Sequence, residues 1–341
     1  MADTKNMTAE AVETADERKP LLSVKDLRKA FPIKKSLTGK VQQELIAVDN
    51  VSFDLYPGET LGIVGESGCG KTTLGRTILK LHPSNGGQII YDGNDITSYS
   101  KTQMRSLRTE MQIIFQDPYA SLNPRMNVEK IISEPLITHK IYPTKEATRA
   151  RVIELMQEVG IPVEFIHRYP HQFSGGQRQR IGIARALALQ PKLIVCDEPV
   201  SALDVSIQSQ VLNLLDDLQE QYKLTYLFIS HDLSVVRHIS DRVCVMFLGC
   251  MCEIGNTDEI YEKPMHPYTK FLLDSVPQPD PTMRDDDKEL LTGEIPSPVN
   301  PPSGCRFRTR CPYATEKCAQ EVPELQDIGG RKVACHYPLN V

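Results

Sequence analysis

The segment from residue 65 to residue 72 constrains the fold of this chain most strongly. It reads Gly65-Glu66-Ser67-Gly68-Cys69-Gly70-Lys71-Thr72 and fits the pattern G-x-x-x-x-G-K-[ST] in full. A short apolar strand is expected over 60–64 and a helix over 71–81. In a strand–loop–helix of this kind, glycines let successive backbone N–H groups point at phosphate oxygens beside the positive end of the helix dipole. The pattern therefore predicts a phosphate-binding loop.

The residue types in the loop predict what individual side chains bind. Lys71 is expected to reach the β- and γ-phosphates of a nucleoside triphosphate, and the hydroxyl of Thr72 is expected to bind Mg²⁺. Thr73 completes the predicted nucleotide ligands together with the rest of residues 65–72. Cys69 occupies a variable position of the pattern, so we assign no thiol chemistry to it.

An apolar stretch ending in two acidic residues supplies the expected second half of such a site. Leu193-Ile194-Val195-Cys196 reads as a buried strand that delivers Asp197 to the Mg²⁺ site. Glu198 follows immediately and is placed to polarise an attacking water. An apolar strand ending in Asp-Glu is weak evidence alone, but it becomes strong when it follows a complete phosphate loop.

A second helix start also has the features of an anion-binding site. Ser174 is a natural N-cap, and Gly175 and Gly176 expose backbone N–H groups at the start of a helix that continues through Gln177. A chain with one phosphate loop has no evident need for a second anion site of its own. We therefore expect this segment to bind the γ-phosphate of a nucleotide held by a different subunit.

Composition limits the remaining possibilities. The 341 residues suggest about two domains, and 40% hydrophobic with 24% charged residues is ordinary for a globular protein with a core. The net charge of −5 provides no basic field for nucleic acid. Residues 1–20 are polar and charged, which predicts a disordered tail and not a secretory signal. The alternation of strands, loops and helices predicts an α/β sheet with a helical insertion at about 117–190.

Four of the nine cysteines gather near the C-terminus. Cys305, Cys311, Cys318 and Cys335 have the spacing C-x5-C-x6-C-x16-C, which matches no tight zinc or ferredoxin pattern. Several thiolates in a small segment without a core of its own suggest a structural metal. The spacing alone does not name the metal, and zinc or simply buried thiols remain alternatives.

With these motifs in place, the chain resembles the ATP-binding-cassette (ABC) family of transporter ATPases, because Ser174–Gln177 stands at the family's signature position between the two phosphate-site motifs. The resemblance implies an α/β P-loop fold with a parallel-sheet core, an antiparallel β subdomain and a helical subdomain. It implies that Gln116 contacts Mg²⁺ and senses a membrane partner, and that Ser201–Asp204 crosses a dimer interface. It further implies that His231 contacts the γ-phosphate and that Phe31 stacks on adenine, which makes Lys71, Glu198 and His231 the expected catalytic residues.

Several stretches are similar to one branch of this family, the ATPase subunits of dipeptide and oligopeptide importers. The similarity extends from about residue 21 to residue 337 and is carried by four stretches: Phe115–Arg125, Tyr169–Phe173, His266–Tyr268 and Pro301–Cys305. It is closest to the second of the two ATPases that such systems usually carry. This resemblance implies that the four late cysteines hold a [4Fe–4S] cluster.

The resemblance also implies an assembly. The expected domains are an ATPase domain over 21–265 and an extension over 266–341 with a Pro-rich linker and the cysteine group. The expected partners are two membrane permease subunits, a second homologous ATPase and an extracytoplasmic peptide-binding protein, which place the chain at the cytoplasmic face of the cell membrane. Alternatives are an importer ATPase for another cargo, such as nickel or an opine, and a soluble ABC ATPase without a transport role.

Overall fold

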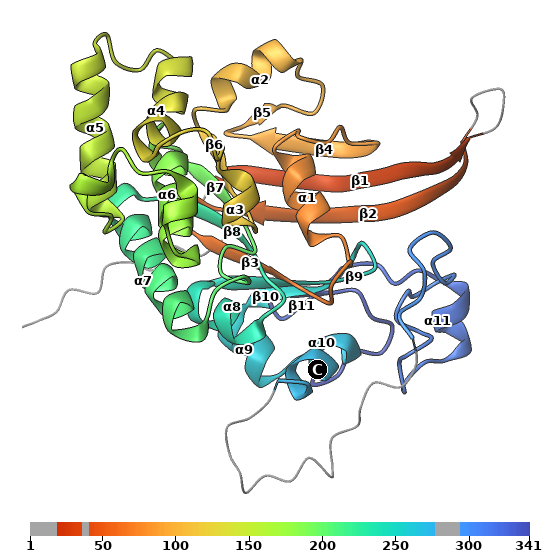
Figure 1. The fold of residues 1–341 in the computed structure, drawn as a ribbon. Coiled ribbons are helices and arrows are strands. Elements are labelled where there is room, and N and C mark those ends of the chain that lie inside the picture. The colour runs from red at the N-terminus through yellow and green to blue at the C-terminus, as the bar shows by residue number, and fades with distance from the viewer. Residues whose placement is uncertain (1–18, 36–40, 277–293) are drawn as a thin grey trace, which may run out of the picture.

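The computed structural model describes residues 19–35, 41–276 and 294–341, and an eight-stranded sheet forms its centre (Figure 1). The strand order is β11-β12-β10-β9-β3-β8-β7-β6, and the five strands from β9 to β6 run parallel. Every residue of β3, β7 and β8 is buried, as expected for parallel strands covered on both faces. These strands are β3 (Thr60–Val64), β6 (Met111–Ile114), β7 (Leu193–Asp197), β8 (Thr225–Ile229), β9 (Arg242–Phe247), β10 (Cys250–Asn256), β11 (Gln326–Ile328) and β12 (Arg331–Val333).

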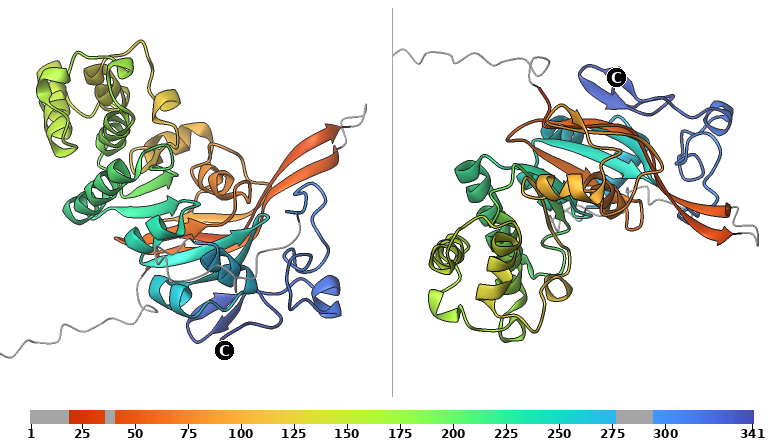
Figure 2. Two further views of the ribbon diagram at one scale, coloured as in Figure 1. Left: turned by 60° about the horizontal axis from the view of Figure 1, so that its bottom comes forward. Right: turned by 90° about the horizontal axis from the view of Figure 1, so that it is seen from above.

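A second, antiparallel sheet has the order β2-β1-β4-β5. Its strands are β1 (Leu22–Lys35), β2 (Val41–Leu55), β4 (Gly86–Tyr91) and β5 (Asn94–Asp95). β1 and β2 form a long ribbon that projects from the body of the molecule (Figure 2). The sequence predicts a hairpin loop over the basic stretch 34–44. In the structure, β1 continues to Lys35 and β2 begins at Val41, and residues 36–40 of this stretch lie outside the described residues.

Helices cover the sheets and form a separate group at one end. They are α1 (Lys71–Ile78), α2 (Lys101–Leu107), α3 (Pro118–Ser121), α4 (Val128–Thr138), α5 (Lys145–Glu158), α6 (Gly175–Leu187), α7 (Val205–Tyr222), α8 (Leu233–Ile239), α9 (Thr257–Glu262), α10 (Pro267–Asp274) and α11 (Glu316–Gln320), with 3₁₀ turns at Val163–Phe165 and Pro170–Gln172. Helices α3 to α6 fall within the segment for which a helical insertion is expected. Their fully buried apolar faces, which include Ile132, Val152 and Ile181, share one core with the outer strands of the central sheet. The parallel core sheet, the antiparallel sheet and the helical group confirm the predicted fold class.

The C-terminal extension docks onto the core sheet at the end opposite the helical group (Figures 1 and 2). β12 pairs antiparallel with β10, with Glu253 opposite Val333, and so adds the extension to the central sheet. Phe307 is buried among rings of the core, with centroids 5.4 Å from Phe247 and 5.3 Å from Tyr268. The proposed division at residue 265 therefore separates segments that share a sheet and an aromatic cluster.

Two predicted features fall mainly outside the described residues. The tail predicted for residues 1–20 overlaps with the undescribed residues 1–18, and the Pro-rich linker overlaps with 277–293. Within the described part of the chain, no helix is long and apolar enough to cross a lipid bilayer.

The aromatic cluster generates a stability prediction. Phe307→Ala is expected to lower the free energy of unfolding by about 3–5 kcal/mol, because it removes a buried ring and leaves a cavity between the extension and the core. Val322→Ala, at a side chain that is 71% exposed in the same extension, should change it by less than about 0.5 kcal/mol. Urea unfolding monitored by circular dichroism measures both, and equal stabilities of the two variants would contradict the anchoring role of Phe307.

Candidate functional site

The phosphate loop joins β3 to α1 and is shaped by glycines. Gly70 caps α1 with φ +106°, and a Cβ atom there would lie 2.0 Å from the carbonyl oxygen of Ala47. Gly65 has φ +151°, and a Cβ atom there would lie 2.1 Å from the carbonyl oxygen of Met246. Because no side chain caps α1, its first N–H groups remain available to an anion at the positive end of the helix dipole.

A cavity of about 510 Å³ opens over this loop. It is lined by Leu45 and Ala47 and by ten of the predicted site residues: Phe31, Ser67, Gly68, Gly70, Lys71, Thr72, Thr73, Gln116, Glu198 and His231. The wall formed by Phe31 with Leu45 and Ala47 is apolar, which suits a flat base, whereas the loop end is rich in N–H and hydroxyl donors. The cavity thus combines a base-sized apolar side with a phosphate-sized polar side.

Lys71 is held inside the loop by backbone oxygens. Its side chain is buried, and Nζ donates to the carbonyl oxygens of Gly65 at 2.7 Å and of Glu66 at 3.1 Å. Cys69 is buried next to it, and burial raises the pKa of its thiol. Gly65, Glu66 and Cys69, which the sequence places among the nucleotide ligands, therefore form the back of the loop and not the lining of the cavity.

The side chains predicted to bind Mg²⁺ lie next to one another. The hydroxyl of Thr72 donates to Oδ1 of Asp197 at 2.7 Å, and Nη2 of Arg76 lies 3.3 Å from Oδ2. Asp197 is fully buried, so its charge needs these partners. Thr72, Asp197 and the amide oxygen of Gln116 are the groups that would hold the cation of MgATP, because Mg²⁺ prefers oxygen ligands.

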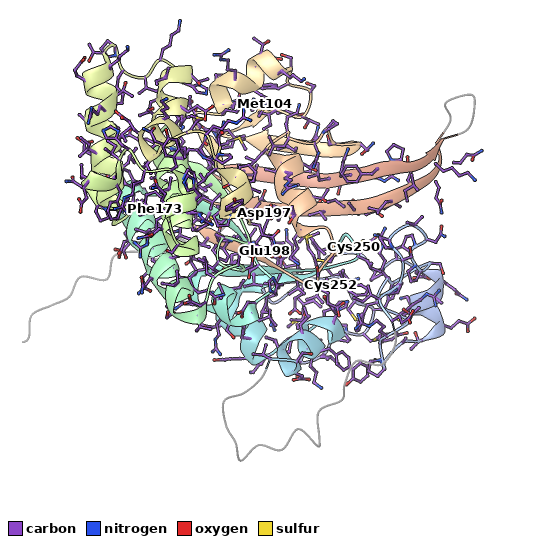
Figure 3. All side chains as sticks on the ribbon, viewed as in Figure 1. Met104, Phe173, Asp197, Glu198, Cys250 and Cys252 are labelled. Atoms are coloured by element: carbon purple, nitrogen blue, oxygen red, sulfur yellow. The ribbon has the colours of Figure 1, made fainter. Side chains whose placement is uncertain are left out.

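Two of the predicted residues contact the same carboxylate oxygen of Glu198. The Gln116 amide donates to Oε2 of Glu198 at 2.7 Å, and Nδ1 of His231 lies 3.2 Å from the same oxygen. Glu198 has φ +48°, in the left-handed region that non-glycine residues rarely adopt. Such backbone strain often marks functional positions, because the surrounding structure must hold it in place. Asp197 and Glu198 lie near the centre of the molecule, between the helical group and the extension (Figure 3).

Ser174 and Gln177 form a capping box at the start of α6. The Ser174 side chain accepts from the Gln177 N–H at 3.3 Å, and the Gln177 side chain accepts from the Ser174 N–H at 3.1 Å. A Cβ atom on Gly176 would lie 2.4 Å from Cγ2 of Ile207, so glycine permits α6 to approach α7 closely. None of Ser174–Gln177 lines the cavity over the phosphate loop, so the structure does not bring this segment to the chain's own nucleotide site.

The loop 201–204 connects Glu198 to α7. The Ser201 hydroxyl donates to the carbonyl oxygen of Glu198 at 3.1 Å, and Asp204 caps α7 by accepting from the Ile207 N–H at 3.0 Å. The expected interface loop is therefore tied at one end to the residue predicted to activate water, and at the other end to the helix that packs against Gly176.

The structure contradicts the prediction of a [4Fe–4S] cluster. Among the described residues there is no group of three or more His, Cys, Asp or Glu side chains arranged to hold a metal ion, so the zinc alternative has no support either. Burial, together with the neighbouring thiols, raises the pKa of both Cys311 and Cys335 to about 11. The prediction assumed a segment without a core, but the extension shares an aromatic cluster and a sheet with the ATPase core.

Sequence reasoning missed two residues at the phosphate loop. Arg310 binds the carboxylate of Glu66 through two hydrogen bonds, and the Tyr268 hydroxyl accepts from the Glu66 N–H. Arg310 and Glu66 are 244 positions apart. Nothing local in the sequence pairs them, because only the docking of the extension brings them together.

Comparisons with known proteins agree with this architecture. Residues 48–201 match the family model described as "ABC transporter", and residues 252–318 match the one described as "Oligopeptide/dipeptide transporter, C-terminal region". The chain is 53% identical over 328 residues to the oligopeptide transport ATP-binding protein AppF of Bacillus subtilis, covering 95% of this chain and 99% of that protein. It is 52% identical over 321 residues to the oligopeptide transport ATP-binding protein OppF of Escherichia coli, covering 93% and 96% of the two chains.

A solved structure shares the fold of the core. The dimeric ATP-binding cassette MJ0796 bound to ADP and Pi has a TM-score of 0.62 and 27% identity, covering 69% of this chain and 98% of that one. Two family models match this chain, and the relatives are similar to it over nearly their full length. This chain belongs to the ABC transporter ATP-binding proteins, in the branch that carries the oligopeptide/dipeptide transporter C-terminal region.

Proposed function

We propose that this chain is the ATP-hydrolysing subunit of an importer for dipeptides or oligopeptides. The convergence of Gln116 and His231 on the Glu198 carboxylate, beside the phosphate loop, carries the ATPase part of the proposal. The printed function of the relatives and the match of residues 252–318 support peptide cargo over the nickel and opine alternatives.

The proposal gives each side chain of the site a task. The phosphate loop holds the triphosphate through backbone N–H groups and Lys71. The Glu198 carboxylate accepts a proton from, or orients, the attacking water, while Gln116 and His231 fix the position of its Oε2 atom. Thr72, Gln116 and Asp197 would hold the cation of MgATP, which would neutralise phosphate charge there.

Glu198→Gln tests this assignment. The substitution keeps the size of the side chain but removes its capacity to take a proton, so ATP turnover should fall by at least about 100-fold while ATP binding is retained. Glu110→Gln is a matched control, because Glu110 pairs with Lys192 at 3.0 Å and does not line the cavity. Steady-state phosphate release and ATP titration measure both variants, and turnover near the wild-type value in Glu198→Gln would remove Glu198 from this role.

We further propose that a complete site needs a second, homologous ATPase subunit. The capping box at the start of α6 occupies the N–H groups of Ser174 and Gln177 and leaves those of Gly175 and Gly176 for an anion, yet this segment does not line the chain's own cavity. Two subunits arranged head to tail would place each Ser174–Gln177 segment opposite the other subunit's phosphate loop. The dimeric state of the similar cassette supports this arrangement.

Ser174→Arg tests the shared site. A bulky side chain at this helix start should block the approach to the partner's phosphates, so turnover falls while ATP still binds to the chain's own loop. Thr144→Arg removes the equivalent N-cap of α5 and controls for the loss of helix capping, which costs about 1 kcal/mol. If Ser174→Arg and Thr144→Arg have the same turnover, the start of α6 takes no part in hydrolysis.

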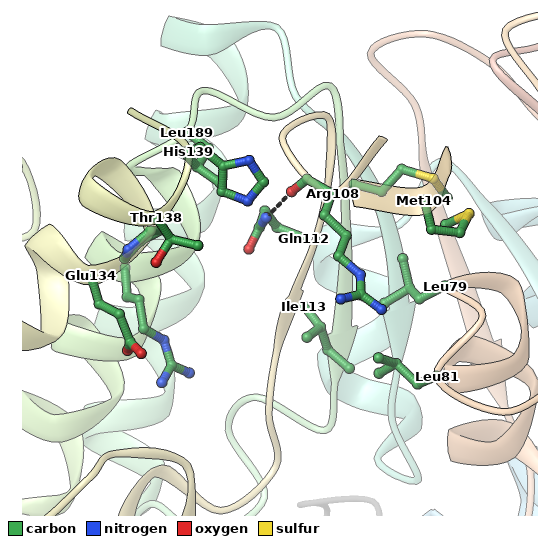
Figure 4. A pocket seen from close by; sticks show the side chains of 13 residues that line it. Leu79, Leu81, Met104, Arg108, Gln112, Ile113, Glu134, Thr138, His139 and Leu189 are labelled. Atoms are coloured by element: carbon green, nitrogen blue, oxygen red, sulfur yellow. Dashed lines mark hydrogen bonds between the residues drawn. The ribbon is translucent and has the colours of Figure 1, made fainter. Parts of the chain in front are cut away.

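A groove between the core and the helical group offers a surface to a membrane partner. It has a volume of about 360 Å³ and lies between α2 and β6 on one side and α4 on the other (Figure 4). Its wall combines apolar residues such as Leu81 and Met104 with Arg108 and Glu134, which fits a short amphipathic helix. β6 also leads directly to Gln116, so a helix bound here would contact the strand that positions a site residue.

The proposed partners follow from this groove and from the family. Two permease subunits with their own membrane-spanning segments would each present a cytoplasmic helix to one ATPase subunit, and an extracytoplasmic protein would deliver the peptide. The chain itself would act as a peripheral protein at the cytoplasmic face of the cell membrane.

Leu81→Asp tests the docking surface. Leu81 is 45% exposed and lines the groove, so a carboxylate there should weaken co-purification with the permease subunits but leave ATP binding by the isolated chain intact. Val322→Asp places the same charge at an exposed apolar position of the extension, far from this groove. Undiminished co-purification of the Leu81→Asp variant would exclude this groove as the permease contact.

A further inference from the structure

The C-terminal extension reaches the back of the phosphate loop at Glu66. Nη1 and Nη2 of Arg310 lie 2.8 Å and 3.1 Å from the two carboxylate oxygens of Glu66, a bidentate pair. The Arg310 side chain is 6% exposed and that of Glu66 is 23% exposed, so solvent screens this pair only weakly. From α10, the Tyr268 hydroxyl accepts a hydrogen bond of 2.9 Å from the Glu66 N–H.

Glu66 is thereby fixed at three of its groups. Its carboxylate binds Arg310, its N–H binds Tyr268, and its carbonyl oxygen accepts from Nζ of Lys71 at 3.1 Å. Its carbonyl oxygen also accepts from the Cys69 N–H at 3.2 Å, within the same loop. The extension therefore holds one of the two residues whose carbonyl oxygens support the Lys71 side chain.

The two extension-side partners are themselves held firmly. Phe307 packs against Tyr268 and against Phe247, and its carbonyl oxygen accepts from the Arg310 N–H at 3.0 Å. Tyr268 is fully buried and follows His266, which caps α10. One aromatic cluster thus fixes both the hydroxyl and the guanidinium that contact the loop.

The charge of Glu66 gives this contact a functional consequence. A carboxylate within a loop that binds a polyanion repels the phosphates unless a cation neutralises it and turns it away from them. Arg310 does both, since its guanidinium binds the two oxygens on the side of the extension. Neither the geometry of the phosphate loop nor its predicted contacts with ATP require an acidic residue at position 66.

We propose that Arg310 is a positioning residue for ATP binding, which neutralises and orients Glu66 while Tyr268 fixes the backbone of that residue. This inference rests on the proposed function, because it assumes that the loop binds ATP. It makes the extension a part of the nucleotide site, although none of the described residues of the extension lines the cavity itself.

The central experiment compares Arg310→Ala with Arg308→Ala in the full-length chain. Arg308 belongs to the same segment, and its guanidinium donates to Ser303 within the extension, so it controls for the loss of an arginine there. Arg310→Ala should raise the Kd for ATP and the KM by about tenfold, equivalent to about 1.4 kcal/mol, with kcat at saturating ATP nearly unchanged. Arg308→Ala should match the wild-type chain in all three quantities.

The double variant Arg310→Ala/Glu66→Gln separates this role from simple structural support. Removing the unpaired carboxylate should restore the Kd for ATP to within about threefold of the wild-type value, because the repulsion disappears with the charge. A merely structural role of Arg310 predicts no restoration, since the double variant lacks the ion pair as well. Titration with MgATP by calorimetry, in the Glu198→Gln background to prevent turnover, provides the readout.

Each outcome decides between the alternatives. Equal Kd values for Arg310→Ala and Arg308→Ala, or no restoration by Glu66→Gln, would overturn the inference. If Arg310→Ala does not fold, Arg310→Lys keeps the charge but loses the bidentate fork, and an unchanged Kd in that variant would equally overturn the orienting role. A wild-type chain that binds no ATP would instead refute the proposed function, so the two failures are distinguishable.

Discussion

The order of four neighbouring parallel strands determines where every catalytic group lies. β3, β8, β7 and β6 stand side by side, and each is followed at its carboxyl end by a segment of the site. The phosphate loop follows β3, His231 follows β8, Asp197 ends β7 with Glu198 after it, and Gln116 follows β6. Carboxyl ends of adjacent parallel strands meet at one edge of a sheet, so residues far apart in the chain converge there.

This arrangement explains why ten of the residues predicted from the sequence line one cavity over the phosphate loop. Each motif is local, because a buried apolar run of about five residues ends in the polar group that performs the chemistry. Glycines that must approach a backbone closely, such as Gly65 and Gly70, are identifiable from the loop pattern alone. The register that brings Gln116 and His231 to one oxygen of Glu198 is not local, and here the family resemblance supplied what the pattern could not.

The extension shows the limit of the same reasoning. Its four cysteines and many prolines suggest a segment that a metal must stabilise, but its stability comes from contacts with distant parts of the chain. Phe307 completes a ring cluster of the core, β12 extends the central sheet, and Arg306 binds Asp49 on β2. Contacts that span so much of the chain leave no periodic signal, so neither the docking of the extension nor the pairing of Arg310 with Glu66 can be predicted from sequence.

Three carboxylates surround a site for a polyanionic ligand, and each has its own compensating partners. Asp197 is paired with Thr72 and Arg76, Glu198 accepts from Gln116 and lies beside His231, and Glu66 is bound by Arg310. The partners differ in kind because the tasks differ. A cation ligand must stay ionised, a proton acceptor must keep an oxygen accessible, and an acidic residue behind the loop must be neutralised. The extension performs the third task, because its Arg310 neutralises Glu66. Residues of the core provide the partners of the other two carboxylates, Asp197 and Glu198.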